Sequence, residues 1–309
     1  MRTVHRFKNS SNGLTFDPRN YYSWVDTGID TNEEAASDEV EIDCDADPTT
    51  AIPTGTIIKI EDELMAVTNS ANPALTVTRT DAVVHATNQD IYKRVNNCVL
   101  YLEGQQDAVS GTIKDLSGYG NHGTITGATD VRIGSGLRVK YFDGTDDYIT
   151  CGDGVSLDCT TGLTMMCWIN TSVAGSNTFI MGRDSAASRN YYLLFSANQL
   201  AFICFVGDSA VTSGNDATTA FAQNKWVFVA GTFSTTSKVL SPYVNAVLGA
   251  TQASNGPIDN DDVSLMIGCR VGLDRDYTGY QWGNRVFNRE FTATEIARIF
   301  NQERSLFNV

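Results

Sequence analysis

Asp115-Leu-Ser-Gly-Tyr-Gly-Asn-His-Gly-Thr124 and Phe142-Asp-Gly-Thr-Asp-Asp-Tyr-Ile149 are the two stretches that decide the fold of this chain. Each places Gly, Asn or Asp next to residues that favour β-strands, so each predicts a strand, a tight turn and a second strand. Evenly spaced, strand-sized segments follow them to near the C-terminus. The pattern therefore predicts an all-β fold.

The segments after residue 97 have the spacing of strands in two stacked antiparallel sheets. The expected strands are Cys98–Glu103, Leu137–Phe142, Tyr148–Cys151, Leu163–Asn170, Thr178–Gly182, Tyr191–Ser196, Leu200–Val206, Trp226–Phe233, Val239–Val244, Ser264–Gly268 and Tyr280–Phe287. Thr292-Ala-Thr-Glu295 is a capping box, and apolar residues follow it at helical spacing. One short C-terminal helix is therefore expected.

Two further parts are expected before this domain. Residues 1–36 show little periodicity and predict an extended arm that orders against its own chain or a neighbouring subunit. Residues 37–96 predict a small β module, because Val40, Ile42 and Cys44 alternate with acidic residues at its start. The predicted division is therefore an arm (1–36), a small β module (37–96) and a larger β domain (97–309).

The composition argues against several classes of protein. A formal net charge of −14 repels phosphate groups, so no nucleic acid partner is expected. No apolar run reaches the roughly 20 residues of a membrane span, so no membrane insertion is expected, and no secretion signal is visible. The seven cysteines are irregularly spaced, which predicts reduced thiols and synthesis in a reducing cytosol.

No set of residues predicts catalysis. Glu41-Ile-Asp43-Cys-Asp45 approaches the Glu-x-Asp-x-Glu pattern of some glycoside hydrolases, but its last residue is one methylene shorter, and it lies in the small module. A solvated edge strand is the simpler interpretation. His122 belongs to the turn Asn121-His-Gly123, where a turn role is expected. We expect no enzyme, no catalytic residue and no cofactor-binding residue.

The order and spacing of several phrases over residues ~97–305 resemble the laminin-G-like, concanavalin A-like jelly roll. Leu163-Thr-Met-Met-Cys-Trp-Ile169, Lys225-Trp-Val-Phe-Val-Ala-Gly-Thr-Phe233 and Met266-Ile-Gly268 match strands of that family. Trp282 and Gly283 depart from it, since they stand where Asp and Glu are usual. The resemblance implies a jelly-roll sandwich, a fold that usually binds or builds and only sometimes catalyses.

A second resemblance concerns the small module. The phrase from Ile52 to Ala86 resembles a small β module of phage virion proteins, although Thr80 replaces the usual glycine. The matching residues are Glu63, Met65, Val67, Thr76 to Arg79, and His85. This resemblance implies docking onto a virion.

Two kinds of binding residue are expected in the jelly roll. Acidic loops suit Ca²⁺, which jelly rolls of this family often hold, and Asp143 and Asp147 are the candidate ligands because they flank the family-like turn. The alternative is that these carboxylates only bond local backbone. Trp282, with Tyr277 and Tyr280, is a candidate contact for a glycan or partner, with core or interface packing as the alternative. Trp168 and Trp226 lie in apolar strand runs, which predicts core packing.

These expectations lead to three hypotheses on function. The first is a non-enzymatic structural protein of a phage virion, made in the host cytoplasm, that decorates the capsid or belongs to a fibre or the tail. Its partners would be capsid or tail proteins and further copies of itself. The second is a carbohydrate-binding lectin module for a host-surface glycan. The third is a glycoside hydrolase, for which the sequence supplies no carboxylate pair.

Overall fold

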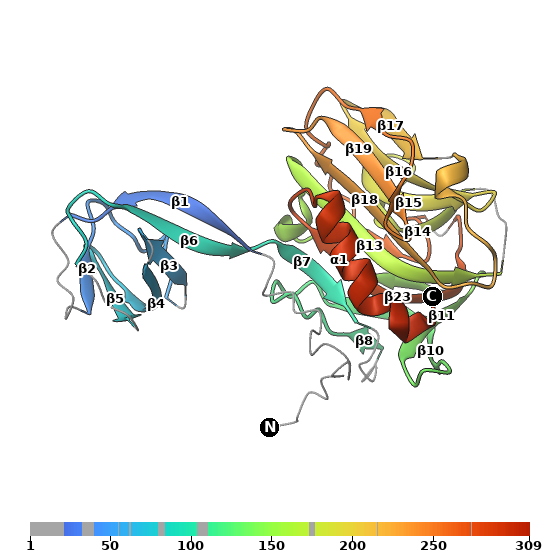
Figure 1. Cartoon of the computed structure of the whole chain (residues 1–309), viewed down its shortest axis with the longest axis horizontal. Helices are drawn as coiled ribbons and strands as arrows, with labels where there is room; N and C mark the ends of the chain where they lie inside the picture. Colours follow the sequence, from blue (N-terminus) through green and yellow to red (C-terminus); the bar gives the residue numbers. More distant parts are fainter. Residues whose placement is uncertain are drawn as a thin grey trace. The chain divides into compact units, whose positions relative to one another are not determined.

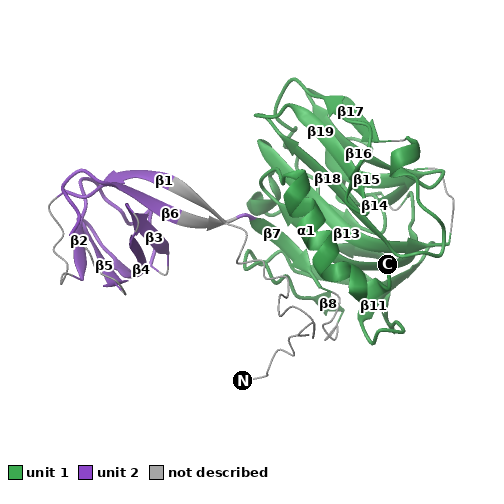
Figure 2. Cartoon of the chain, in the orientation of Figure 1, with its two compact units in different colours: residues 1–18, 98–309 green, residues 19–97 purple. Residues whose placement is uncertain are grey.

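The chain forms two compact units (Figure 2). The computed structural model describes residues 22–32, 40–54, 56–61, 63–79, 84–103, 111–172, 177–214, 216–272 and 274–309. The described part of the small unit runs from residue 22 to residue 97, and the jelly-roll unit runs from residue 98 to residue 309.

The small unit is one antiparallel sheet, with six strands among the described residues. Its strands lie in the order β1 (Tyr22–Asp30), β6 (Asp90–Asn96), β3 (Ile57–Ile60), β4 (Glu63–Ser70), β5 (Ala74–Arg79) and β2 (Glu41–Asp43). The alternation expected at β2 is present, because Ile42 and Cys44 are buried while Glu41 is exposed. Val40, which was expected on the buried side, is 59% exposed.

The strand β1 corrects the predicted extent of the arm. Residues 22–30 belong to the sheet of the small unit, where β1 pairs with β6 from Tyr22 opposite Asn96 to Asp30 opposite Asp90. The partner strand lies more than 50 residues further along the chain, so no local hairpin signal marks β1 in the sequence. The rest of the predicted arm, residues 1–21 and 33–36, lies outside the described residues.

A buried polar network joins three of the residues that resemble the phage module. The carboxylate of Glu63 accepts hydrogen bonds from Nε and Nη2 of Arg79, at 2.9 and 2.6 Å. His85, which is fully buried, has its Nε2 2.8 Å from Glu63 Oε2 and its Nδ1 2.9 Å from Glu61 Oε2. The phrase therefore has a structural basis, because it encodes polar side chains that satisfy one another inside the unit.

The jelly-roll unit consists of two packed antiparallel sheets, as predicted (Figure 1). The first, which we call the helix-side sheet, has nine strands among the described residues. Along its main path these are β10 (Thr129–Arg132), β11 (Arg138–Asp143), β23 (Thr278–Phe287), β13 (Gly162–Thr171), β18 (Val227–Ser234), β19 (Val239–Val244) and β20 (Val247–Leu248), with β7 (Cys98–Leu102) beside β23 and β21 (Gln252–Ala253) beside β19.

The second sheet, which we call the opposite sheet, has eight strands within the described part of the chain. Their order is β17 (Ser209–Gly214), β16 (Gln199–Val206), β15 (Arg189–Ser196), β14 (Thr178–Asp184), β22 (Leu265–Ile267), β12 (Tyr148–Thr150), β9 (Gly123–Thr126) and β8 (Thr112–Ile113). Three short 3₁₀ turns lie in the described residues: η2 (Val155–Leu157), η3 (Ala217–Thr219) and η4 (Arg304–Phe307). All eleven strands expected after residue 97 are confirmed. That set of eleven does not include β8, β9, β10, β17, β20 or β21.

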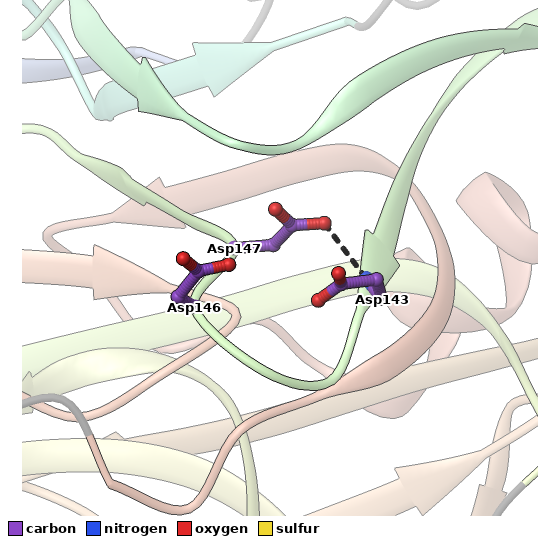
Figure 3. A group of neighbouring side chains, drawn as sticks. All are labelled: Asp143, Asp146 and Asp147. Carbon is purple, nitrogen blue, oxygen red and sulfur yellow. Dashed lines mark hydrogen bonds between the residues drawn. The ribbon is translucent and has the colours of Figure 1, made fainter.

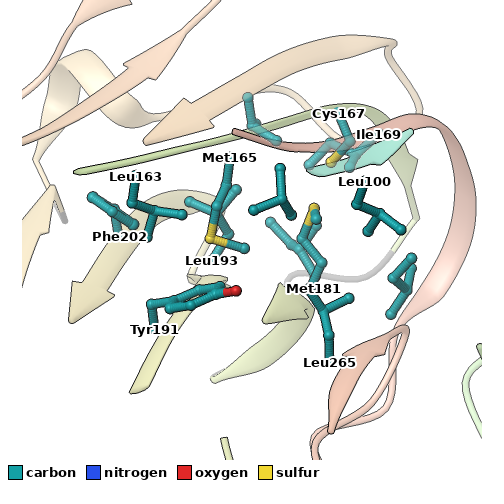
Figure 4. Packing of buried hydrophobic residues seen from close by; sticks show 14 of the residues in the cluster. Leu100, Leu163, Met165, Cys167, Ile169, Met181, Tyr191, Leu193, Phe202 and Leu265 are labelled. Atoms are coloured by element: carbon teal, nitrogen blue, oxygen red, sulfur yellow. The ribbon is translucent and has the colours of Figure 1, made fainter. Parts of the chain in front are cut away.

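The core lies between the two sheets, because alternate residues of the central strands point inward (Figure 4). On β13 the inward residues, all fully buried, are Leu163, Met165, Cys167 and Ile169. Across the gap, Phe202 of β16 lies against Gly231 of β18, where an added Cβ would be 2.5 Å from the ring. Only glycine at residue 231 lets this aromatic ring approach the backbone of the facing sheet.

The first turn phrase is held together by one buried carboxylate. Asp115 accepts hydrogen bonds from the backbone N–H groups of Tyr101, Ser117 and Asn121, at 2.9, 2.9 and 3.0 Å. The backbone N–H of Asp115 in turn donates to Nδ1 of His122, at 3.1 Å. His122 therefore takes part in the turn itself, in the role that the sequence analysis expected for it.

The C-terminal helix α1 (Ala293–Glu303) begins at the predicted capping box. The hydroxyl of Thr292 accepts from the backbone N–H of Glu295, and the Glu295 carboxylate accepts from that of Thr292. The helix lies on the outer face of the helix-side sheet (Figure 1), where Phe300 stacks on Trp168 with ring centroids 5.8 Å apart. The helix forms for two reasons: the cap starts it locally, and its apolar stripe is buried against the sheet.

A buried carboxylate at the end of α1 fixes the helix to the sheet. Glu303, 4% exposed, accepts from the indole N–H of Trp168 at 2.8 Å and pairs with both terminal nitrogens of Arg285. Burial opposes the charge of Arg285, but the charges and hydrogen bonds of Glu303 and Tyr101 together more than offset this, so the pKa of Arg285 is raised. The guanidinium also lies over the rings of Tyr101 and Trp282.

All seven cysteines are buried free thiols. Burial raises the pKa of Cys44 to about 11 and those of Cys159 and Cys269 to about 12, which keeps these thiols protonated and unreactive at neutral pH. Within the described residues, no helix is both long enough and apolar enough to cross a membrane.

The Glu303 contact generates the first prediction. Glu303→Ala should lower the free energy of unfolding by about 3–5 kcal/mol, because it leaves the Arg285 charge buried without its partner. The measurement is urea unfolding of the full chain, followed by tryptophan fluorescence. Asn301→Ala, an exposed change in the same helical turn, should stay within about 0.5 kcal/mol of the parent. Equal effects of the two changes would show that the buried pair does not anchor the helix.

Candidate ligand-binding face of the jelly roll

The second turn phrase brings three carboxylates together at the end of β11 (Figure 3). Asp143, Asp146 and Asp147 each offer an oxygen, and these oxygens lie within 4.8 Å of one another. The turn is built on Gly144, whose φ of 85° and contact with Thr278 leave no room for a side chain. The two residues predicted as ligands are therefore adjacent, and Asp146 joins them.

Asp147 is the fixed member of this group. It is 6% exposed, and its Oδ2 accepts a hydrogen bond from the backbone N–H of Asp143, at 2.7 Å. A Cβ on residue 127 would lie only 1.9 Å from Oδ1 of Asp147, so residue 127 must be glycine. Asp143 and Asp146 are exposed, and Asp143 Oδ1 accepts from the backbone N–H of Thr145, at 2.8 Å.

The charges of this turn repel one another. Burial raises the pKa of Asp147, and the charges of Asp143 and Asp146 add to the rise. Burial also raises the pKa of the neighbouring Asp276, and the charges of Asp274, Asp143 and Asp146 add to that rise. Ca²⁺ binds oxygens at about 2.3–2.6 Å, so ligands on opposite sides of one ion are about 5 Å apart. The spacing of the three carboxylates therefore fits one Ca²⁺ ion. The hydrogen bonds that Asp143 and Asp147 accept from the backbone of the turn are compatible with binding this ion.

Two further acidic loops of the jelly roll, one with Asp153 and Asp158 and the other with Asp259, Asp261 and Asp262, also carry several carboxylates, and most of these bind the protein itself. Asp158 pairs with the guanidinium of Arg183, and Asp259 accepts from the backbone N–H groups of Gly207 and Asp208, at 2.7 and 2.8 Å. Asp261 accepts from the backbone N–H of Arg189, at 2.9 Å. Most of these carboxylates therefore organise loops, as Asp commonly does in turns.

The structure separates the three aromatic residues that were predicted to contact a ligand. Tyr277 is fully buried between the sheets, edge-on to Phe142 with centroids 5.8 Å apart. Trp282 is 4% exposed and covered by Phe307, at 5.5 Å. Neither offers a surface for stacking, so packing, the alternative left open by the sequence, holds for both. Tyr280 is partly exposed.

Tyr280 belongs to a row of partly exposed aromatic residues that the sequence analysis did not identify. Tyr141 of β11 lies directly opposite Tyr280 of β23, with ring centroids 5.1 Å apart. Trp226, just before β18, lies 6.3 Å from Tyr280. Core packing was the wrong prediction for Trp226, because α1 and η4 cover only part of this face. Alternation along β11 was the available signal for Tyr141.

The aromatic row and the acidic turn share one face. Side chains of a strand alternate between its faces, so Asp143, two residues after Tyr141, points to the same outer side of the helix-side sheet. Thr278, opposite Asp143, lies two residues before Tyr280 on β23. We call the row Tyr141, Tyr280 and Trp226, together with the turn 143–147, the aromatic–acidic face. It combines flat rings with oxygens that suit a cation, a combination that can hold a polyhydroxylated ligand.

The near-miss hydrolase motif lies elsewhere. Glu41 and Asp43 are in β2 of the small unit, and Asp45 Oδ1 accepts from the backbone N–H of Asp30, at 2.9 Å. These carboxylates therefore belong to a strand edge of the small sheet and not to the jelly roll.

Comparison with known proteins agrees with this fold. Residues 143–297, just over half of the chain, match the family described as the concanavalin A-like lectin/glucanases superfamily. The match begins at Asp143 and ends within α1, so it lies wholly in the jelly-roll unit. No curated protein matches the chain.

Similar solved structures are toxin binding domains. The binding domain of Paraclostridial Mosquitocidal Protein 1 is 16% identical with a TM-score of 0.54, over 67% of this chain and 52% of that one. The receptor-binding domain of botulinum neurotoxin C/D mosaic serotype is 14% identical with a TM-score of 0.53, over 67% and 51%. The binding domain of botulinum neurotoxin DC, in complex with SialylT, is 16% identical with a TM-score of 0.50, over 67% and 52%.

These likenesses concern the fold alone. The matched part spans about half of each toxin domain.

The acidic turn generates the second prediction. A carboxyl whose pKa is raised by folding costs stability as the pH rises from about 4 through that raised pKa, and a bound cation removes this cost. At about 10 mM, Ca²⁺ should raise the melting temperature by about 3 °C or more at pH 7 and by much less at pH 4.

The matched variants are Asp147→Asn, which should abolish the effect of calcium, and Asp208→Asn, which changes an exposed Asp in another turn and should preserve it. Differential scanning calorimetry with calcium or EDTA measures both. A calcium response that survives Asp147→Asn would rule out this site.

Proposed function

Because the chain belongs to the concanavalin A-like lectin/glucanases superfamily, we propose that its jelly-roll unit is a binding module for carbohydrate on a receptor or cell surface, without catalysis. The observation that carries this proposal is the aromatic–acidic face. Tyr141, Tyr280 and Trp226 are partly exposed on one side of a rigid sheet, next to a turn of three carboxylates.

The chemistry of this face suits a sugar. The apolar C–H side of a sugar ring packs on aromatic rings, and the tyrosine hydroxyl and tryptophan N–H groups can hydrogen-bond at its rim. Tyr141 and Tyr280 lie on strands, and Trp226 directly precedes one, so little side-chain freedom is lost on binding. A Ca²⁺ held by Asp143, Asp146 and Asp147 would supply ligand positions for sugar hydroxyls.

The toxin domains support binding in general terms. They share the fold of the jelly-roll unit, their descriptions name binding or receptor binding, and one was solved with SialylT. A common fold does not transfer a ligand, so the ligand of this chain is proposed from its own surface. A hydrolase is not favoured, because the motif nearest to a catalytic pair lies in β2 of the small unit.

The role in a phage virion stays a separate proposal. It rests on the phrase in the small unit whose residues Glu63, Arg79 and His85 form the buried network. In this proposal the small unit docks onto capsid or tail proteins and the jelly roll is displayed outward. Light scattering measures the mass of the chain with and without residues 1–36. If both forms are monomers and neither associates with virion proteins, the proposal of a virion role is wrong.

The third prediction concerns the aromatic row. Tyr280→Ala and Trp226→Ala should each weaken binding of a neutral oligosaccharide by about 3- to 10-fold, which corresponds to about 0.5–1.5 kcal/mol per aromatic contact. A glycan array with the wild-type chain identifies the saccharide, and calorimetric titration gives the affinities.

Tyr119→Ala is the matched control, since Tyr119 is an aromatic residue of the first turn phrase with 40% exposure. It should leave the affinity unchanged. An array without any bound glycan, in calcium and in EDTA, would contradict the proposed function.

A further inference from the structure

A second row of aromatic residues lies beside the accessible row on the outer face of the helix-side sheet. Trp168 of β13 lies directly opposite Trp282 of β23 on one side and Phe228 of β18 on the other. Trp282 comes two residues after Tyr280, and Phe228 comes two residues after Trp226, so both rows share one face. We call Trp282, Trp168 and Phe228 the covered row, because all three are buried.

The ring of Phe307 lies over the boundary between the two rows. Its centroid is 4.3 Å from that of Trp168, 4.6 Å from that of Trp226 and 5.5 Å from that of Trp282. Phe307 itself is 5% exposed. Because Trp226 belongs to the accessible row and Trp282 to the covered row, removal of this ring would join the two rows into one aromatic surface.

The segment that carries Phe307 lies beyond the anchor of the helix. Glu303 fixes the end of α1 to the sheet through buried hydrogen bonds. Residues 304–309, which we call the cover segment, follow this anchor and form hydrogen bonds within the segment. The backbone N–H of Val309 donates to the carbonyl of Arg304, at 3.3 Å, and Nε of Arg304 donates to an oxygen of Val309, at 2.7 Å. The cover segment can therefore leave the sheet while Glu303 keeps its contacts.

The indole N–H of Trp282 is an unused donor in the covered row. Trp282 is 4% exposed, and its Nε1 has no hydrogen-bond partner within the described part of the chain. The indole N–H of Trp168, in contrast, donates to Glu303. The neighbouring ring of Phe307 offers Trp282 no oxygen. A buried donor without an acceptor is costly, so a hydroxyl group in the place of that ring would supply a missing hydrogen bond.

We infer that residues 304–309 are a displaceable cover, and that an oligosaccharide on the accessible row replaces the Phe307 ring and extends to Trp282. The inference rests on the proposed function and defines its ligand more closely, as a chain of several sugar residues that spans both rows. Sugar rings pack on indole rings as the Phe307 ring does, and their hydroxyl groups also accept hydrogen bonds. The closed cover lowers the apparent affinity, because only the open fraction of the molecules binds the whole ligand.

Hydrogen exchange of the wild-type full chain tests the displacement directly. The ligand is a neutral oligosaccharide that a glycan array identifies. At saturation it should make the backbone amides of residues 304–309 exchange several-fold faster, because the segment leaves the sheet, whereas those of residues 296–303 in α1 should not speed up. Exchange of residues 304–309 that stays equal or becomes slower with the ligand would overturn the inference.

Two variants separate the cover from the donor. Phe307→Ala should tighten binding of the oligosaccharide by about tenfold, since one buried aromatic side chain no longer competes with it. Phe300→Ala is the matched control, because its ring packs on Trp168 and Phe228 from α1, and it should not tighten binding. Trp282→Phe, which removes the N–H, should weaken the oligosaccharide by about 2- to 10-fold. It should leave the affinity of the shortest ligand, which reaches only the accessible row, unchanged.

Calorimetric titration measures these affinities, and circular dichroism shows whether each variant folds. The inference is wrong if folded Phe307→Ala binds no more tightly than the wild type, or if Trp282→Phe weakens short and long ligands equally. If Phe307→Ala does not fold, hydrogen exchange of the wild type decides. Where a glycan still binds the aromatic–acidic face in these cases, the proposed function stands. If neither the wild type nor Phe307→Ala binds any arrayed glycan, both fail.

Discussion

The carboxylate of Glu303 is the contact on which the outer face of the jelly roll depends. It joins the last turn of α1 to Trp168 and Arg285 on two neighbouring strands. Because both partners are buried, the helix cannot slide along the sheet without leaving a charge unpaired in an apolar environment. The position of α1 and η4 then decides which aromatic residues of the sheet are covered and which stay accessible.

The same constraint accounts for the difference between two tryptophans. Trp282 lies under Phe307 of η4 and has become part of the core between helix and sheet. Trp226 also contacts Phe307, with centroids 4.6 Å apart, but lies at the border of the covered area and stays partly exposed. Together with Tyr280 and Tyr141 it extends the aromatic surface toward the acidic turn. A structural helix thereby defines the limits of the candidate binding face.

Local signals in the sequence predicted most of the fold. The capping box at Thr292 gives the helix its start, and period-two alternation gives the strands of the two sheets. The turn phrase at Asp143 placed its carboxylates together, because a tight turn necessarily brings close residues together. These features are local, so a single sequence contains them.

Three features that the sequence did not predict depend on distant contacts. Strand β1 pairs with β6, more than 50 residues away. The exposure of Trp226 depends on where the C-terminal η4 lies, and the cluster of three arginines around Asp184 brings the β14–β15 hairpin together with the distant loop between β22 and β23. In each case the residue types were visible in the sequence, but their neighbours were not.

The most direct measurement is a crystal structure of the full chain with a neutral oligosaccharide that it binds. The account predicts that a sugar ring lies on Tyr280 and Trp226, beside the turn 143–147, with α1 unmoved. A saccharide bound only at another surface, or a second copy of the chain covering this face, would contradict it.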